Sequence, residues 1–201
     1  MYEFTSALAK VGFCSAGVSP EGHQHRWTRD KAKIDVLVPR GLGDRASARN
    51  GVTGGTTPGA PGAQQAIDRS QPVPVEMEGL QGEVWRPSML GALVMKAAAY
   101  TTPEPNRDRH LIDFATLASM LARTDHINKE LTRSDRKYLS RAVAALDGKR
   151  SLWVMIEGAL RGVDAVRRAT SQQLEHGRAK ELEHQSPQMP VEPGHGPDLD
   201  L

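Results

Sequence analysis

One segment near the middle of the chain limits the folds that are open to it. Residues 87–100 are Pro-Ser-Met-Leu-Gly-Ala-Leu-Val-Met-Lys-Ala-Ala-Ala-Tyr, and they begin with a proline, which is common at helix starts. A helix with this sequence is apolar on nearly every side, so other elements have to surround it. The segment is interrupted by Lys96 and is too short to cross a bilayer. It therefore predicts a buried helix in a protein that does not span a membrane.

All of the expected strands come before this segment, together with two helices, and only helical patterns come after it. The expected elements are a helix over 1–11, strands over 23–28 and 33–38, a short helix over 63–70, a hairpin over 73–85, and helices over 88–100, up to about 123, 133–146 and 151–184. This order predicts an α+β protein with a small mixed β-sheet followed by a helical bundle. We expect a sheet domain over 1–86, a helical domain over 87–185 and a disordered tail over 186–201.

Local signals mark some of the helix ends. Thr132 followed by Asp135 predicts an N-terminal cap for the helix over 133–146. The last helical pattern contains Gly158 and Gly162, and we expect a break near one of them.

Residues 39–64 are rich in Gly, Ser, Thr and Pro and carry few large apolar side chains. Such a segment buries too little surface to offset the entropy of ordering it, so we expect a mobile Gly-rich loop. The spacing of its glycines fits neither the dinucleotide-binding nor the Walker phosphate-binding pattern. A flexible loop is therefore a better interpretation than a phosphate-binding loop.

Charge and cysteine content exclude several classes of protein. The 26 Lys and Arg residues nearly balance the 24 Asp and Glu residues, and a net charge of +2 is too small for a general nucleic-acid coat protein. The single cysteine, Cys14, excludes an intrachain disulfide and makes a reducing compartment the default. We therefore expect a cytoplasmic protein.

Lys96 is the only charged residue between Arg86 and Glu104. If it is buried, it needs a carboxylate or an anionic ligand, or else it loses its proton; alternatively, its stem lies along apolar surface while the amine reaches water. Asp113 lies among apolar neighbours in the next helix, four residues after Arg109, and either Lys96 or Arg109 could pair with it. A structural ion pair between two helices and a catalytic arrangement are both compatible with this pattern.

Asp35 lies at the centre of a β-branched strand, against the propensity of aspartate. It could bind a divalent metal if it faces a cleft, or it could be an ordinary edge-strand charge if it faces solvent, which spacing alone favours. His23 and His25 lie on the same side of a strand, but no third ligand is close in sequence, so a zinc site is disfavoured.

The basic residues form two groups. The first would attract a polyanion such as a nucleotide or RNA if its members converge, and it consists of Arg26, Arg29, Lys31, Lys33, Arg86, Lys96, Arg107 and Arg109. The second is more typical of a solvated helix face and consists of Arg123, Arg133, Arg136, Lys137 and Arg141.

Several short motifs occur in a recognisable order. They are Gly12-Phe13, Lys33-Ile34-Asp35-Val36-Leu37-Val38-Pro39, Trp85-Arg86-Pro87, Leu90 through Ala98, and Arg107-Asp108-Arg109-His110-Leu111-Ile112-Asp113. In this order they resemble the AbiEii-like nucleotidyltransferases, the toxin-type branch of the polymerase-beta-like nucleotidyltransferase superfamily. The last motif is similar to the family's Arg-x-Lys-Asp-x-x-Asp element, with Arg109-His110 in place of Lys-Asp.

The resemblance implies transfer of a nucleoside monophosphate from an NTP to a nucleic acid, such as tRNA or another RNA, or to a protein. It implies Mg²⁺ as the cofactor, with Asp35 as a catalytic and metal-binding carboxylate. Lys96 would neutralise the triphosphate, Asp113 would orient Lys96, and Arg107 and Arg109 would contact phosphates. An antitoxin or complementing protein would be a partner.

The sequence departs from the family at its main metal site. The family's Gly-Ser turn and the Asp-x-Asp or Asp-x-Glu strand that follows it are missing, and Asp35 resembles only the third, more distal carboxylate. Two-metal chemistry needs more oxygen ligands than one aspartate supplies. We expect either a fragment whose natural start lies upstream or a degenerate member. The alternative is a non-catalytic nucleotide- or RNA-binding module, or a protein-interaction module, that retains the fold.

The first helix supports the fragment hypothesis, because it begins at residue 1 without a cap. Phe4, Leu8 and Val11 share one face of this helix, which predicts its buried side. If upstream strands are missing, unpaired strand edges would make the isolated chain prone to aggregation or dependent on a partner.

Overall fold

The computed structural model describes residues 1–43, 48–122, 127 and 130–184, and for 172–184 it describes the backbone only. Its helices are α1 (Tyr2–Lys10), α3 (Ala63–Asp68), α4 (Met89–Ala99), α5 (Asp108–Ser119), α6 (Arg133–Asp147), the 3₁₀ helix η2 (Arg150–Leu152) and α7 (Ala159–His184). Its strands are β1 (Cys14–Ser15), β2 (Arg26–Arg29), β3 (Ala32–Asp35), β4 (Val38–Pro39), β5 (Gly59–Ala60), β6 (Ser70–Met77) and β7 (Leu80–Pro87). The protein is α+β, as predicted. No helix in these ranges is both long and apolar enough to span a membrane.

The strands form three small sheets, so the expected single sheet is divided. Strands β1, β2 and β3 pair in that order as an antiparallel sheet, β4 and β5 pair in parallel, and β6 and β7 form an antiparallel hairpin. The first predicted strand begins at Arg26 rather than His23, because His23 instead forms an isolated bridge with Thr56. The second predicted strand ends at Asp35, and Val38 pairs with Gly59 in a different sheet.

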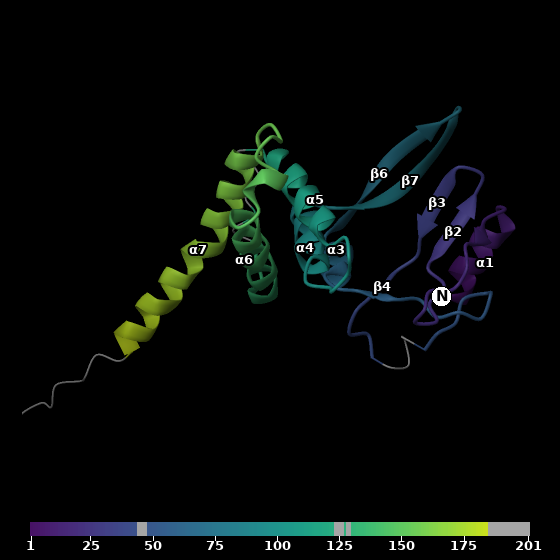
Figure 1. Ribbon diagram of the computed structural model, residues 1–201, viewed down its shortest axis with the longest axis horizontal. Helices are drawn as coiled ribbons and strands as arrows, with labels where there is room; N and C mark the ends of the chain where they lie inside the picture. The colour runs from purple at the N-terminus through teal and green to yellow at the C-terminus, as the bar shows by residue number, and fades with distance from the viewer. Residues whose placement is uncertain (44–47, 123–126, 128–129, 185–201) are drawn as a thin grey trace, which may run out of the picture.

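Two separate hydrophobic clusters hold these elements. The smaller one lies between α1 and the first sheet and contains Leu8, Phe13, Trp27 and Val36. The larger one is built by α4, α5, α6 and α7, which lie together in Figure 1. Within it, α4 buries residues on several sides, as its apolar sequence predicts, and Ser88 caps its first turn by accepting the N–H of Gly91 at 3.2 Å.

The predicted apolar face of α1 is only partly correct. Leu8 is buried, but Phe4 is 53% exposed and Val11 is 55% exposed. Thr5 is buried instead, because its hydroxyl oxygen accepts the backbone N–H of Val52 at 2.8 Å. A contact with a residue far along the chain therefore determines which side of this amphipathic helix faces the core.

Residues 48–62 are mostly irregular, as predicted, but they are attached to the first sheet by specific contacts. The side-chain oxygen of Gln24 accepts the backbone N–H of Gly55 at 2.8 Å and also binds the hydroxyl of Thr53. Thr57 is buried. These contacts give hydrogen-bond partners within the protein to polar groups of the segment. Its low content of apolar residues did not predict such contacts. Residues 44–47 of the expected mobile loop lie outside the described residues, as does the expected tail over 186–201.

The β6–β7 hairpin is longer than predicted and projects from the rest of the chain (Figure 1). Glu78 and Gly79 have φ values of 52° and 78°, which makes a two-residue turn of the kind that favours glycine and matches the twist of the strands. The hairpin leaves Met77 and Leu80 at its tip 71% and 72% exposed, and Trp85 is 69% exposed.

The base of this hairpin is tied to α6 by a buried ion pair. Arg69, between α3 and β6, donates to Asp135 at 2.6 Å and to the carbonyl of Glu130 at 3.0 Å. Asp135 also accepts the N–H of Thr132, and its own N–H is accepted by the Thr132 hydroxyl, which completes the predicted capping box of α6. The Asp135 side chain is 0% exposed, so its charge depends on these partners.

We predict that Asp135→Ala lowers the free energy of unfolding by about 3 kcal/mol or more, because it leaves the largely buried Arg69 without its partner and removes the cap. Urea unfolding followed by circular dichroism measures this change. Asp147→Ala is the matched control: Asp147 ends the same helix, is 58% exposed and pairs with Arg167. The control should change stability by less than about 1 kcal/mol. Equal effects of the two substitutions would contradict this account.

The long final helical pattern breaks at Gly158, one of the two predicted sites. Gly158 has a φ of 77°, and α7 begins at the next residue. Gly162 lies inside α7, where a Cβ atom would overlap the backbone carbonyl of Ala118 in α5. The absence of a side chain therefore allows α5 and α7 to pack closely.

We predict that Gly162→Ala destabilises the protein by about 2 kcal/mol, because overpacking against backbone outweighs the gain in helix propensity. Gly148→Ala is the control, since the added Cβ would meet only an ordinary contact at 3.7 Å from the Ala145 carbonyl. Thermal unfolding should show a clear loss for the first variant and little change for the second. A Gly162→Ala protein as stable as the wild type would show that α5 and α7 do not pack this closely.

Candidate functional site

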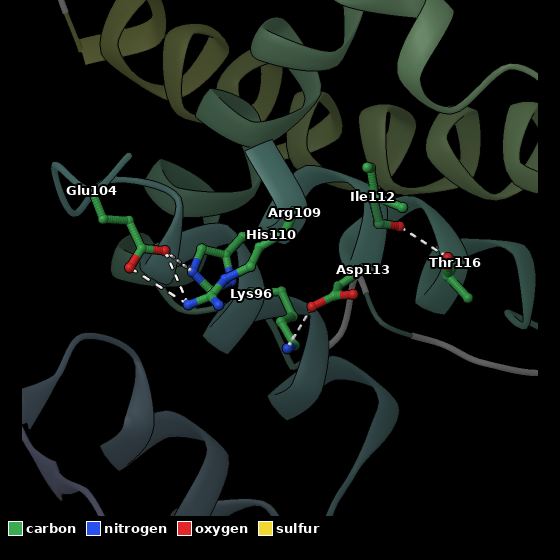
Figure 2. A network of polar contacts seen from close by, with 7 residues as sticks. All are labelled: Lys96, Glu104, Arg109, His110, Ile112, Asp113 and Thr116. Carbon is green, nitrogen blue, oxygen red and sulfur yellow. Dashed lines mark hydrogen bonds and ion pairs between the residues drawn. The ribbon is translucent and has the colours of Figure 1, made fainter. Parts of the chain in front are cut away.

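Lys96 and Asp113 form an ion pair between α4 and α5 (Figure 2). Nζ of Lys96 lies 2.7 Å from Oδ2 of Asp113. Of the two cations that the sequence offered as partners for Asp113, the structure therefore selects Lys96. The two side chains are 30% and 46% exposed. Lys96 thus has a carboxylate partner and also reaches water from a helix that is otherwise largely buried.

Three more polar side chains lie beside this pair, around the start of α5 (Figure 2). Glu104, in the connection from α4 to α5, accepts from Arg109 at 3.3 Å and lies 2.7 Å from Nε2 of His110. Arg109 precedes Asp113 by four residues and His110 precedes it by three, so all three share one helix face. Arg107 lies close by along the chain, with its guanidinium 5.2 Å from the centroid of the Tyr100 ring.

Asp35 lies on β3, an edge strand of the first sheet, and its carboxylate is bound by its cross-strand neighbour. Arg26 donates through Nε to Oδ1 at 2.8 Å and through Nη2 to Oδ2 at 3.0 Å. These hydrogen bonds are the main reason why the pKa of Asp35 is below its ordinary value, and the charges of Arg26, His25 and Arg109 lower it further. Asp35 itself makes no hydrogen bond or ion pair with Lys96 or Asp113 in the described part of the chain.

The residues around Asp35 do not fit a magnesium site as they are arranged. Mg²⁺ binds several oxygen ligands in a near-octahedral geometry, whereas both oxygens of Asp35 already accept from Arg26. Among the residues that the structure describes, no three His, Cys, Asp or Glu side chains gather where a metal ion could bind. His23, considered above for zinc, lies 2.8 Å from the Thr56 hydroxyl. Binding of Mg²⁺ remains a prediction of the resemblance that this arrangement does not support.

The first group of basic residues converges only in part. Arg29 packs over the Phe13 ring at 5.0 Å and donates to the carbonyl of Val11 at 2.7 Å, so it serves the fold of the N-terminal part. Arg26 is occupied by Asp35. Lys31 and Lys33 lie at or on β3, and Arg86 lies on β7. The members of the group on α4 and at the start of α5 are Lys96, Arg107 and Arg109.

Sequence reasoning missed Glu104 and the placement of His110. Both lie near the predicted site, and the signal available was their spacing: a carboxylate six residues before a histidine, across a proline-marked turn. The spacing alone did not show that the loop before α5 folds back, so that Glu104 contacts Arg109 and His110.

No family model matches the chain, and neither the curated proteins nor the solved structures contain a significant match to it. The resemblance to nucleotidyltransferases therefore rests on the short motifs alone.

We predict that Asp35→Asn lowers stability at neutral pH and that this difference disappears in acid. The folded-state pKa of Asp35 is lower than its unfolded value, so the carboxylate stabilises the protein above its ordinary pKa near 4, and this contribution is lost as the pH falls through the folded-state pKa. Urea unfolding of both proteins between about pH 7 and pH 2.5 measures it.

The Arg26→Gln background is the control, because Arg26 is the main cause of the shift. In that background, Asp35→Asn should have a smaller and less pH-dependent effect. A wild-type difference that persists unchanged at low pH would show that the carboxylate charge is not responsible.

Proposed function

We propose that this chain is a nucleotidyltransferase-like protein that binds the phosphates of a nucleoside triphosphate but does not transfer the nucleotide. The observation that carries the proposal is the state of Lys96. Its amine emerges from a largely buried helix, remains accessible and is held by a single exposed carboxylate. A partly exposed pair of this kind contributes at most about 1 kcal/mol to stability, so an anionic ligand can compete with Asp113 for the amine.

Two arginines extend the same cationic face. Arg109 shares its helix face with Asp113 and is 55% exposed, with a long contact of 3.3 Å to Glu104. Arg107 has an aromatic neighbour, Tyr100, and no ion pair with a carboxylate in the described residues. Charge-assisted hydrogen bonds from Arg and Lys to phosphate oxygens are among the stronger ones that proteins make. These three side chains would bind the triphosphate.

The non-catalytic form of the proposal is favoured by the bidentate contact of Arg26 with Asp35. That contact engages the carboxylate that the family resemblance assigns to the metal and to catalysis. Transfer to a tRNA, another RNA or a protein acceptor would require Asp35 to exchange Arg26 for a metal ion. A cytoplasmic location and an antitoxin or complementing protein as partner belong to the same proposal.

Calorimetric titration of the full chain with ATP and the other NTPs, with and without Mg²⁺, tests the proposal. We expect saturable binding that Lys96→Ala weakens about tenfold or more, because hydrogen bonds to charged groups contribute about 1.5–3 kcal/mol. Lys10→Ala, which removes an exposed lysine from α1, should bind like the wild type. Lys96→Ala should change the free energy of unfolding by less than about 1 kcal/mol, so that weaker binding is separable from unfolding.

Two results would contradict parts of this proposal. Absence of saturable binding, or equal binding by Lys96→Ala, would remove the nucleotide site. Incorporation of a labelled nucleoside monophosphate into RNA or protein would instead show that the chain is a catalyst, with Asp35 released from Arg26.

A protein-interaction module is the second candidate, and the projecting hairpin favours it. Pro72 and Pro74 lack N–H groups and lie on the outer edge of β6, whereas the N–H of Glu83 on β7 points outward in this register. The edge of β7 can therefore accept another strand, and the exposed tip of Met77 and Leu80 would be covered in such a pairing. A chain that binds no NTP but forms a stable dimer by light scattering would favour this candidate, with β7 pairing between two copies.

A further inference from the structure

The second group of basic residues, which the sequence indicated as a solvated helix face, lines a groove. The groove lies between α6 and the first half of α7, and these two segments are neighbours in Figure 1. Its lining residues are Arg133, Ser134, Arg136, Lys137, Ser140 and Thr170. Among the residues whose side chains the structure describes, this lining contains three cationic and three hydroxyl side chains and no carboxylate. Arg141, of the same group, follows on α6, and Arg123 lies outside the described residues.

The cations of the groove differ in how they are held. Arg136 donates through Nη1 to the carbonyl of Ala169 at 2.7 Å and so joins α6 to α7. Arg133 and Lys137 are exposed and have no hydrogen bond or ion pair within the described part of the chain. The nearest acid along this part of α6, Asp135, is fully buried and is bound by Arg69. The positive charge that faces the groove is therefore not neutralised by that carboxylate.

The spacing of the exposed cations indicates the shape of their ligand. Arg133, Lys137 and Arg141 follow one another at intervals of four residues, which places successive side chains about 6 Å apart on one face of α6. Like charges at this spacing destabilise a helix, so folding alone does not account for them. A row of cations is complementary to a row of anions more than to a single phosphate, and the hydroxyls of Ser134 and Ser140 can donate hydrogen bonds to phosphate oxygens.

We propose that the α6–α7 groove binds the phosphodiester backbone of a nucleic acid through Arg133 and Lys137. This site is separate from the Lys96 face and does not depend on NTP binding there. Contacts to phosphates carry no sequence information, so the groove orients a strand without reading its bases. The positive end of the α6 macrodipole adds to the attraction near Arg133 and Ser134.

The test measures the binding of a fluorescein-labelled single-stranded RNA of about 20 nucleotides to the full chain by anisotropy, over a range of salt concentrations. The double variant Arg133→Gln/Lys137→Gln should reduce the slope of log K against log salt by about 1.4, since each phosphate contact on a single strand contributes about 0.7. At about 0.1 M salt this corresponds to roughly 25-fold weaker binding.

The control double variant is Arg150→Gln/Arg161→Gln, which removes the same charge from exposed arginines outside the groove. It should bind RNA within about twofold of the wild type. Equal losses in the groove and control variants would show attraction by net charge only and would overturn the proposal. Melting curves of the two double variants should coincide with that of the wild type, because the four substituted side chains have no partners in the described residues.

Additional competition and binding experiments distinguish a nucleic acid from other ligands that carry phosphate. Unlabelled DNA of the same length should compete with the RNA, whereas inorganic tripolyphosphate should compete only at far higher concentration. Tight binding of tripolyphosphate that Arg133→Gln/Lys137→Gln weakens, with no binding of either polymer, would overturn the proposal in favour of a small-anion site in the groove. Groove-dependent binding to vesicles of anionic lipid, without binding to RNA, would overturn it in favour of a membrane surface.

Discussion

The buried ion pair between Arg69 and Asp135 holds together elements that the chain separates by more than sixty residues. Arg69 lies between α3 and β6. Its carbonyl accepts the N–H of Ser88 at 2.8 Å at the start of α4, and its guanidinium binds the capping aspartate of α6. Removing either partner would leave a charge without compensation in a low-dielectric environment. The pair therefore ties the base of the hairpin to the start of α6.

The positions of α4 and α6 have consequences for the two cationic surfaces. Although α4 contributes several buried residues to the larger hydrophobic cluster, the side chain of Lys96 is 30% exposed and pairs with Asp113 of α5. Because Asp135 is turned inward to Arg69, the outward face of α6 keeps its basic residues without that acid. The buried contact with Arg69 thus keeps the Asp135 carboxylate away from the basic residues on the outer face of α6, which remain available for ligands.

Features that depend on residues close together in the sequence could be predicted, whereas features that depend on distant residues could not. The burial of α4, the capping box at Thr132 and Asp135, and the break at Gly158 depend on neighbours within a few residues, and they are confirmed. The buried side of α1 depends on the contact between Thr5 and Val52, and the environment of Asp35 depends on Arg26 across the strand pair. Arg69 gave no local signal at all. Periodicity and caps do not encode such nonlocal partners, which is why the pairing of Lys96 with Asp113 could be proposed but not chosen over Arg109.

Net charge was a poor guide to the surfaces of this protein for the same reason. A balance of 26 basic and 24 acidic residues excludes a uniformly basic coat protein, but it does not say which cations are neutralised locally. Asp35, Asp113 and Asp135 are each committed to one cation, through Arg26, Lys96 and Arg69. Arg133 and Lys137 receive no such partner in the described residues, so a nearly neutral chain still presents a positively charged groove. The distribution of carboxylates among these pairs, and not their number, determines where an anion can bind.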